Sequence, residues 1–165
     1  MGADLTQEYL KSILHYNPDT GIFTWICSRP KINFGDIAGG LDDLGYIRIT
    51  INGKKYKAHR LAIFYMTEKW PPEDTDHKDL NRSNNKWENI RPSSKTQNFG
   101  NQIKYKNNKS GIKGVCWDKD ANKWLAQIQF NKKKIKLGRF NNTEDAKNAY
   151  AKASKELFKE FARTE

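Results

Sequence analysis

The sequence that decides the fold is DTDHKDLNRSNNKWENIR, residues 74–91, in which a histidine stands directly behind an aspartate. The middle of this stretch, residues 78–85, is rich in Asn, Asp and Ser, which favour turns because they bond their own main chain. It does not match a calcium loop, because Lys78 stands where an oxygen ligand is needed and no glycine follows. A single His after Asp is more often structural than catalytic, so the surrounding residues have to decide its role.

The composition predicts a folded chain with small cores. The chain has 165 residues, enough for one ordinary domain or two small ones. Its mean hydropathy is low, at -0.92. Aromatic residues nevertheless make up 12% of the chain, whereas disordered chains contain few of them. We therefore expect compact but small hydrophobic cores.

The charge of the chain is strongly positive and unevenly placed. The formal net charge is +11, of which residues 1–99 carry +2 and residues 100–165 carry +9. A field of this sign attracts polyanions such as nucleic acids. The uneven placement suggests two modules, a near-neutral one followed by a basic one. The alternative is a lysine-rich surface that only keeps the protein soluble.

Cysteine usage and hydropathy exclude several classes. Cys27 and Cys116 are far apart and in no CxxC motif, so they supply no zinc finger by themselves, and two free thiols in a reducing cytoplasm is the simplest interpretation. No stretch approaches the roughly 18 apolar residues of a membrane span, and the N-terminus has no apolar signal core. We expect a cytoplasmic protein with no membrane partner.

Periodicity and turn residues predict the elements of the first half. Asp4 and Gln7 have the form of a capping box before a helical stripe. Residues 17–21 are a dense turn signal, and Asn52-Gly53 predicts a two-residue hairpin turn. The expected elements are helices over 5–15, 59–69 and 94–102, and strands over 22–25, 36–38, 45–51 and 54–58.

The second half predicts a smaller, simpler unit. Residues 105–110 are polar and basic without large aliphatic side chains, which indicates a linker. Three strand candidates follow, and then an amphipathic helix from Thr143 to about Ala162. This order predicts three antiparallel strands with one helix packed across them. The expected strands are 114–117, 123–130 and 132–137.

Motifs in residues 59–98 carry a family resemblance. They are AHRLA at 58–62, the DH pair at 76–77, NN-x-x-x-N with a following aliphatic at 84–90, and S-x-x-x-x-N at 93–98. This segment resembles the HNH endonucleases, specifically the phage and intron-borne homing group. The resemblance implies an α+β fold with an N-terminal mixed region and a ββα-metal (HNH, His-Me finger) nuclease core at about 72–102. Its first strand would end at Asp76-His77, residues 78–88 would form its loop, and Asn89 would begin its second strand.

A second set of motifs resembles a DNA-binding family. The motifs are SGIKGV at 110–115, KWLAQI at 123–128, KLGRF at 136–140 and TEDAKNAYAKA at 143–153. They resemble the Apetala-two / ethylene response factor (ERF) DNA-binding domain, in which a three-stranded sheet enters the major groove. The expected domains are a nuclease domain over 1–104, a linker over 105–110 and an Apetala-two/ERF-like domain over 111–165.

The first resemblance implies roles for four residues. Asp76 and Asn98 would be the metal ligands, His77 the general base, and Asn89 the residue that orients His77. Carboxylate and amide oxygens suit Mg²⁺ or Mn²⁺, which keep several waters, so one ion per active site is expected. A histidine near its ordinary pKa takes a proton from the attacking water.

The second resemblance, with strand alternation, implies the DNA-facing residues. Glutamine pairs with adenine, and lysine reaches guanine or phosphate. Trp117 is open between base contact and core packing, and Arg60 in the nuclease segment is a candidate for a backbone phosphate. For His59 we favour a structural role over one near the phosphate. The expected DNA contacts are Arg60, Lys113, Trp117, Lys119, Gln127, Gln129, Lys134, Lys136 and Arg139.

The two resemblances together predict a metal-dependent HNH DNA endonuclease of homing type, phage-encoded and acting in the host cytoplasm. Its partner would be double-stranded DNA, and it would act as a monomer or weak dimer. One alternative is a non-cleaving, sequence-specific regulator on a decayed nuclease fold. Another is a protein that binds or cleaves RNA.

Overall fold

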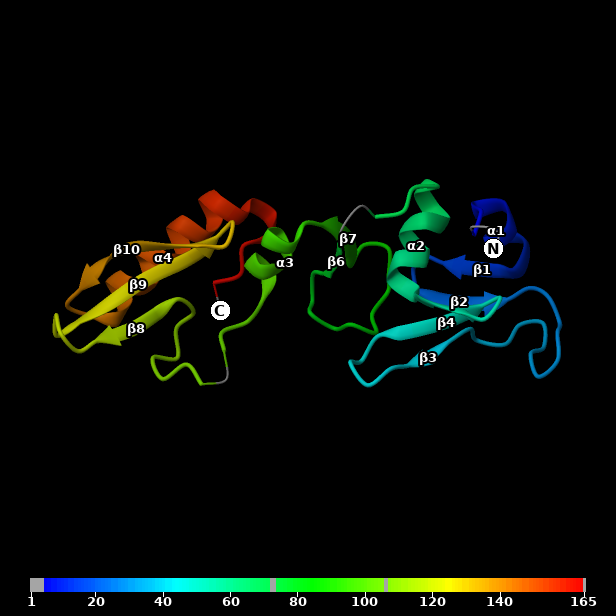
Figure 1. Ribbon diagram of the computed structural model, residues 1–165, viewed down its shortest axis with the longest axis horizontal. Helices are drawn as coiled ribbons and strands as arrows, with labels where there is room; N and C mark the ends of the chain where they lie inside the picture. The colour runs from blue at the N-terminus through cyan, green and yellow to red at the C-terminus, as the bar shows by residue number, and fades with distance from the viewer. Residues whose placement is uncertain (1–4, 72–73, 106, 165) are drawn as a thin grey trace. The chain divides into compact units, whose positions relative to one another are not determined.

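The computed structural model describes residues 5–71, 74–105 and 107–164 and has an α+β architecture with small antiparallel sheets (Figure 1). Its internal contacts divide it into two compact units, Met1–Ser93 and Ser94–Glu165. The predicted linker, residues 105–110, lies inside the second of these units, and its Lys106 lies outside the described residues. The domain boundaries therefore stay a prediction.

The first unit begins with a short helix, α1 (Gln7–Ile13), and a hairpin of β1 (Leu14–Asn17) and β2 (Ile22–Trp25). The predicted cap Asp4 lies outside the described residues, and the Thr6 hydroxyl oxygen accepts from the Tyr9 N–H at 3.2 Å. The helical prediction was wrong for Leu14 and His15. Both pair with β2 instead, because the turn at 17–21 returns the chain along this strand.

A second, three-stranded sheet follows in the order β3-β4-β5, with β3 at Gly40–Leu41, β4 at Ile47–Ile51 and β5 at Lys54–Lys57. The predicted hairpin is confirmed, since Asn52 and Gly53 both have positive φ, at 50° and 75°. The strand expected at 36–38 is reduced to one isolated bridge between Thr24 and Ile37.

The first unit ends with the elements that carry the candidate site. Helix α2 (Ala58–Thr67) buries Leu61, Ala62 and Phe64 in the core, and β6 (Asp74–His77) pairs with β7 (Ile90–Ser93). The second strand thus begins one residue after the expected Asn89. The hydrophobic core lies between α1, the β1–β2 hairpin, the β4–β5 hairpin and α2. Its fully buried side chains are Leu10, Leu14, Phe23, Ile49, Ile51 and Leu61.

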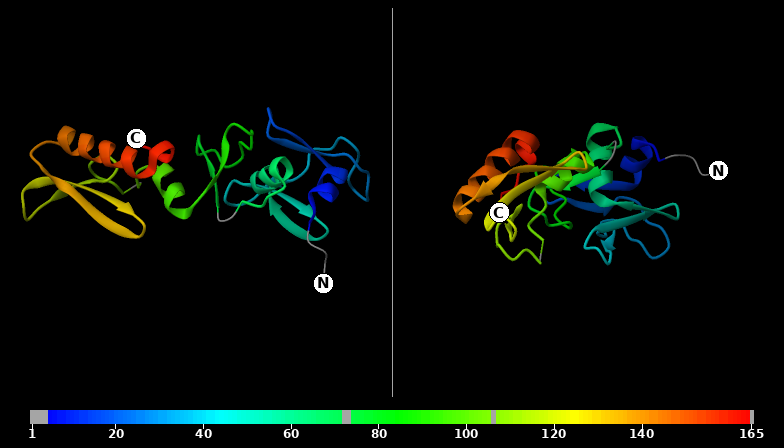
Figure 2. Two further views of the ribbon diagram at one scale, coloured as in Figure 1. Left: turned by 90° about the horizontal axis from the view of Figure 1, so that it is seen from above. Right: turned by 60° about the vertical axis from the view of Figure 1, so that its left-hand side comes forward.

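The second unit confirms the predicted sheet and helix. Helix α3 (Lys95–Asn101) leads to β8 (Val115–Asp118), β9 (Lys123–Phe130) and β10 (Lys133–Phe140), which form a sheet in the order β10-β9-β8. Helix α4 (Thr143–Phe158) runs along one face of this sheet (Figure 2), and a short 3-10 helix, η1 (Lys159–Phe161), follows it. Ile128 and Ala126 of β9 bury their side chains against α4 residues such as Tyr150 and Ala146.

Within the described ranges, no helix is both long enough and apolar enough to cross a membrane.

Gly114 permits the closest contact between the loop before β8 and α4. It has a φ of 73°, and a Cβ there would stand 2.1 Å from Cε2 of Tyr150. We predict that Gly114→Ala lowers the free energy of unfolding by at least about 2 kcal/mol, because the methyl adds a clash to the strain of positive φ. Chemical denaturation would measure the change.

Gly111→Ala is the matched control for Gly114→Ala. Gly111 has a nearly equal φ of 72°, but a Cβ there meets nothing within 4 Å. Its substitution should therefore cost only the backbone strain, about 1 kcal/mol. Equal losses in the two variants would contradict a steric role for the Tyr150 contact.

Candidate active site and nucleic-acid interface

The β6–β7 hairpin presents the acidic and imidazole groups of the candidate site. In its register Asp76 lies opposite Arg91, and His77 lies opposite Ile90. Asp76 and His77 are both buried, with 3% and 4% of their surface exposed. The hairpin is therefore a short, buried support for two polar side chains, which is unusual unless they are paired or functional.

A buried amide holds the imidazole of His77. Its Nε2 lies 3.0 Å from Oδ1 of Asn85, a side chain that is 2% exposed. Because an amide oxygen only accepts, Nε2 of His77 carries the proton and donates it. Burial lowers the pKa of His77, while the Asn85 bond and the carboxylates of Asp79 and Asp76 act against this shift. A neutral His77 therefore has its lone pair on Nδ1, the nitrogen that can take a proton.

The N-terminal hairpin fixes the position of Asn85. The hydroxyl of Tyr16 donates to the Asn85 carbonyl oxygen at 2.7 Å, and the Trp87 N–H donates to the Pro18 carbonyl oxygen at 2.9 Å. Gly21 lies so close that a Cβ on it would stand 2.3 Å from the Asn85 carbonyl carbon. The turn at 17–21 therefore supports the loop that contacts His77.

Asn89 joins the two ends of the same loop. Its side-chain amide donates to Oδ1 of Asp79 at 2.9 Å and to the carbonyl oxygen of Asn84 at 2.7 Å, and its Oδ1 accepts from the Asp79 N–H at 3.1 Å. Its carbonyl oxygen accepts from the N–H of Lys78, the residue after His77, at 2.9 Å. Asn89 thus restrains the main chain next to His77, whereas Asn85 contacts the ring itself. Orientation of His77 by Asn89 stays a prediction.

The expected metal ligands lie on β6 and α3. Oδ2 of Asp76 accepts two bonds from the Arg91 guanidinium, from Nη2 at 2.8 Å and Nε at 3.0 Å. Asn98 belongs to α3, in the second unit. Among the described residues no group of three or more His, Cys, Asp or Glu side chains is placed to hold a metal. A carboxylate and an amide oxygen remain suitable for Mg²⁺, which keeps several waters, and unsuitable for a thiolate or histidine-rich zinc site.

His59 packs against the candidate base. Its ring is 1% exposed, and its centroid lies 4.9 Å from that of His77 in an edge-to-face arrangement. Burial is the largest cause that lowers the pKa of His59 to about 3, so the ring is neutral at pH 7. Its Nδ1 has no hydrogen-bond partner among the residues that the structure describes. The structural role of His59 stays a prediction.

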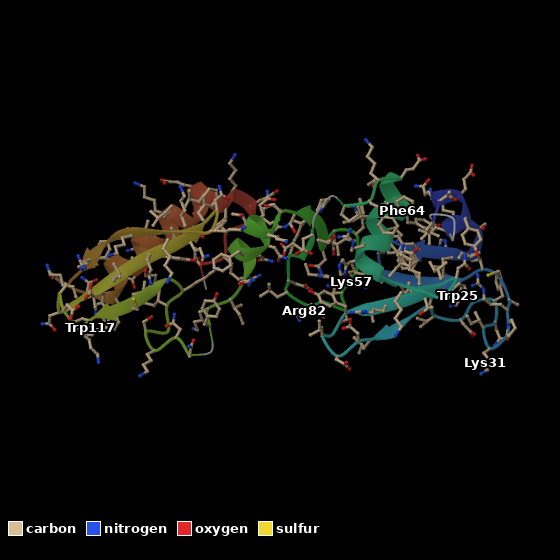
Figure 3. The ribbon with its side chains drawn as sticks, viewed as in Figure 1. Trp25, Lys31, Lys57, Phe64, Arg82 and Trp117 are labelled. Atoms are coloured by element: carbon tan, nitrogen blue, oxygen red, sulfur yellow. The ribbon has the colours of Figure 1, made fainter. Side chains whose placement is uncertain are left out.

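A tyrosine ring, Tyr46, lies next to both imidazoles and is in contact with two cations. Tyr46 lies 5.2 Å from His59 and 6.1 Å from His77 between ring centroids. The Lys57 ammonium stands 4.0 Å from the Tyr46 ring centroid and the Arg82 guanidinium 5.1 Å from it, and Figure 3 shows these two labelled side chains near one another. Positive charge is therefore held over the ring of Tyr46, which is itself a neighbour of both imidazoles.

In the second unit, one sheet face carries the expected DNA contacts. Lys134 lies opposite Gln129 and Lys136 lies opposite Gln127 across β10 and β9, so the four side chains share a face. The alternate residues Ala126 and Ile128 are buried against α4. A hollow of about 630 Å³ is lined in part by Gln127, Gln129 and Lys134. The register thus brings these candidates together on the face that the helix does not cover.

The other candidates lie at the sheet edges or outside the sheet. The Trp117 ring packs edge-to-face on the Trp124 ring, with their centroids 5.0 Å apart. Trp117 lies opposite Trp124 in the register and therefore on the helix side of the sheet, and it is 43% exposed. Nε of Arg139 donates to Asp118 at 2.8 Å. Lys119 is exposed in the turn after β8. Ile135 lies opposite the buried Ile128 in the register and is 39% exposed.

Lys113 does not lie on a DNA-facing surface. It is 8% exposed, and its ammonium donates to the carbonyl oxygens of Gly100 at 2.8 Å, Gln102 at 2.5 Å and Arg163 at 3.2 Å. Burial lowers its pKa to about 8. Three carbonyl acceptors match the three protons of an ammonium. Lys113 therefore holds the end of α3 and the C-terminal segment together, which corrects its expected role as a DNA contact.

Comparisons with known families match two segments of the chain. Residues 56–99 match the family described as HNH endonuclease, and residues 110–160 match the AP2 domain. The matches fit an HNH nuclease with a C-terminal AP2-type domain. A solved structure titled "DNA binding and cleavage by the HNH homing endonuclease I-HmuI" is 28% identical, covers 55% of this chain and has a TM-score of 0.43. The match spans about half of that protein's chain, 51%. No curated protein matches the chain.

Sequence reasoning missed two residues of the HNH segment. Asn85 was assigned to a simple turn, although its side chain contacts His77, and Arg91 was not considered, although it pairs with Asp76. The sequence held a weak indication for Arg91. Asp76 is the last residue but one of β6 and Arg91 is the second residue of β7, so the two lie opposite each other in an antiparallel hairpin. The NN-x-x-x-N motif at 84–90 includes Asn85, but it does not separate Asn85 from its neighbour Asn84.

We predict that Asn85→Ala destabilises the HNH segment by about 1 to 3 kcal/mol, because it removes a partner from a buried imidazole. Nitrogen NMR of the His77 ring should change from the Nε2–H tautomer towards a mixture of tautomers. Asn81→Ala is the control in the same loop, since Asn81 is exposed, and its cost should stay within about 0.5 kcal/mol. An unchanged tautomer signature in Asn85→Ala would show that Asn85 does not fix the ring.

Proposed function

We propose that the protein is a metal-dependent DNA endonuclease of homing type, which nicks or cuts DNA at specific sites by hydrolysing phosphodiester bonds. The observation that carries the proposal is the buried His77, held through Nε2 by Asn85 within a segment that matches the HNH endonucleases. The neighbouring Tyr46 ring carries two cations. By the same resemblance we place it among phage-borne enzymes that act in the cytoplasm of a host cell. One such site per chain favours a nick by a monomer, whereas a dimer would cut both strands.

His77 is the general base in the proposed reaction. Its Nδ1 takes a proton from the water that attacks phosphorus, and the Nε2–H bond to Asn85 stabilises the imidazolium that forms. The low pKa that burial gives His77 keeps the ring neutral before the reaction. Arg82 and Lys57 supply positive charge near the phosphate as negative charge builds on its oxygens.

Asp76 and Asn98 are the proposed ligands of one divalent cation, Mg²⁺ or Mn²⁺. The proposal rests on the family resemblance and on the hard oxygen donors that these side chains offer. When bound, such an ion stabilises charge on the phosphate and on the leaving oxygen. Arg91 orients the Asp76 carboxylate through its two bonds to Oδ2.

The AP2-type domain would hold the DNA. We propose that four side chains of one sheet face enter the major groove: Gln127, Gln129, Lys134 and Lys136. Lys119, Arg139 and Trp117 would contact the DNA from the edges of the sheet. Their common face and the helix packed behind it support this assignment. Base specificity then depends on glutamine and lysine contacts.

A plasmid-nicking assay with and without EDTA tests the proposal. Nicking of supercoiled plasmid by the protein in Mg²⁺, and its loss in EDTA, is the expected result. DNA binding without nicking in any divalent cation would favour the non-cleaving regulator, for which the AP2 match alone is sufficient. Cleavage of RNA in place of DNA would favour the RNA enzyme.

We predict that His77→Ala slows nicking at least about a hundredfold, because general-base catalysis contributes about 10² to 10⁴ to the rate. Affinity for DNA should remain almost unchanged, since the imidazole is buried. His15→Ala is the matched control, because His15 is exposed on β1 and should leave the rate at the wild-type value. Wild-type nicking by His77→Ala would remove His77 from the mechanism.

Charge on the face of the AP2-type sheet gives a separate prediction. The double variant Lys134→Gln, Lys136→Gln should bind DNA at least about tenfold more weakly at low salt, because two cations leave the phosphate contacts. The double variant Lys147→Gln, Lys152→Gln removes the same charge from exposed positions of α4 and should bind nearly as wild type does. Fluorescence anisotropy with a labelled duplex measures both. Equal weakening would mean that only net charge matters.

A further inference from the structure

A small basic pocket lies on the β4–β5 hairpin of the first unit. Its volume is about 240 Å³, and of the six described residues that line it, four are cationic. The near-neutral balance of residues 1–99 conceals this concentration, because acidic residues elsewhere in the segment offset it. The residues that line the pocket are Arg48, Lys55, Tyr56, Lys57, Arg60 and Trp70.

The strand register gathers the charges. Arg48 lies directly opposite Lys57 across β4 and β5, and Lys55 lies opposite Thr50, so these side chains share one face. The alternate face carries Ile49 and Ile51, which are buried in the core. Like charges directly opposite each other destabilise a sheet. A bound anion would reverse that repulsion.

Only part of the positive charge is balanced within the described residues. Asp42 accepts a bond from Nε of Arg48 at 2.5 Å, and Nη2 of Arg60 donates to the Pro71 carbonyl oxygen at 3.1 Å. Lys55 and Lys57 form no ion pair with any residue that the structure describes. As far as the described residues go, the charges of Lys55 and Lys57 therefore remain available to an anion.

Two aromatic residues, Tyr56 and Trp70, also line the pocket. Tyr56 and Trp70 are stacked with their centroids 5.8 Å apart, and Trp70 stacks in turn on Phe64 at 4.4 Å. Apolar walls next to charges reduce the local screening by water and strengthen the attraction for an anion.

We propose that this pocket binds a phosphate group of the DNA backbone, outside the position where the strand is cleaved. Pockets for drug-sized ligands have volumes of about 300 to 1,000 Å³, so the smaller volume here suits a single anionic group. Guanidinium and ammonium donors match phosphate oxygens. The inference rests on the proposed function in taking DNA, rather than another phosphate ester, as the ligand.

Lys57 connects the pocket with the candidate active site. Its side chain lines the pocket, and its ammonium stands 4.0 Å from the centroid of Tyr46, whose ring lies 6.1 Å from that of His77. In the proposed complex, the strand whose scissile phosphate reaches His77 also passes Lys57. The pocket seats a phosphate farther along that strand and fixes its register at the active site.

DNA binding measured in EDTA over a series of salt concentrations tests the proposal. The double variant Lys55→Gln, Lys57→Gln should bind roughly tenfold more weakly at 0.1 M salt. The slope of log affinity against log salt should fall by about 0.9, the value for one lost phosphate contact. The charge-preserving variant Lys55→Arg, Lys57→Arg should keep both values, and thermal melting checks that each variant is folded.

The matched control removes the same charge elsewhere in the first unit. Lys11 and Lys31 are exposed and do not line the pocket, and Figure 3 shows Lys31 on the distant loop of this unit, away from Lys57. The variant Lys11→Gln, Lys31→Gln should keep the wild-type slope. Equal slopes in the two Gln variants would overturn the proposal, as would a wild-type slope in Lys55→Gln, Lys57→Gln.

Two further measurements separate the ligand and the function. Weakened binding of duplex RNA, with duplex DNA binding unchanged, would overturn the assignment to DNA. A wild-type protein that binds inorganic phosphate at the pocket, with DNA binding insensitive to the Lys variants, would also overturn it. EDTA prevents cleavage, so the binding measurement does not depend on the nicking assay. If the protein does not nick DNA, the slope of log affinity against log salt still tests whether the pocket binds a phosphate.

Discussion

The close approach of the turn at 17–21 to the main chain of Asn85 is the constraint on which the candidate site depends. Gly21 has a φ of 73° and leaves no space for a Cβ, and Tyr16 donates to the Asn85 carbonyl oxygen from the same hairpin. Burial raises the pKa of this Tyr16 hydroxyl well above its ordinary value, so it remains a donor. Asn85 in turn contacts His77. The N-terminal hairpin therefore fixes the position of the His77 imidazole, which would be the general base in the proposed reaction.

Strand register, more than segment composition, places the positive charge. On β9 and β10 it collects Gln127, Gln129, Lys134 and Lys136 on the face opposite α4. On β4 and β5 it collects Arg48, Lys55 and Lys57 above a face of buried isoleucines. The positive charge of the first face could be expected, because residues 100–165 are strongly basic as a whole. The second lies in a segment whose net charge is nearly neutral, because acidic residues elsewhere in the segment, such as Asp79 in the loop after β6, offset its cations.

Much of the local structure follows from short-range rules. The Asn52-Gly53 hairpin, the strand at 123–130 and the helix from Thr143 were predicted because turn chemistry and periodicity act within a few residues. The prediction failed at Leu14, where a helical stripe continued into a strand. Pairing with Trp25 decides that position, and pairing between strands overrides local propensity.

The sequence by itself determined the two family resemblances, the uneven charge, and the residue types suited to a hard metal and a general base. Only the tertiary structure decided which polar residues touch. It buried Lys113 beneath three carbonyl oxygens, brought Arg91 to Asp76, and chose Asn85 from a loop of similar residues as the partner of His77. The physical reason is burial, since a polar group removed from water must find a partner, and the partner is supplied by whichever segment the fold brings near.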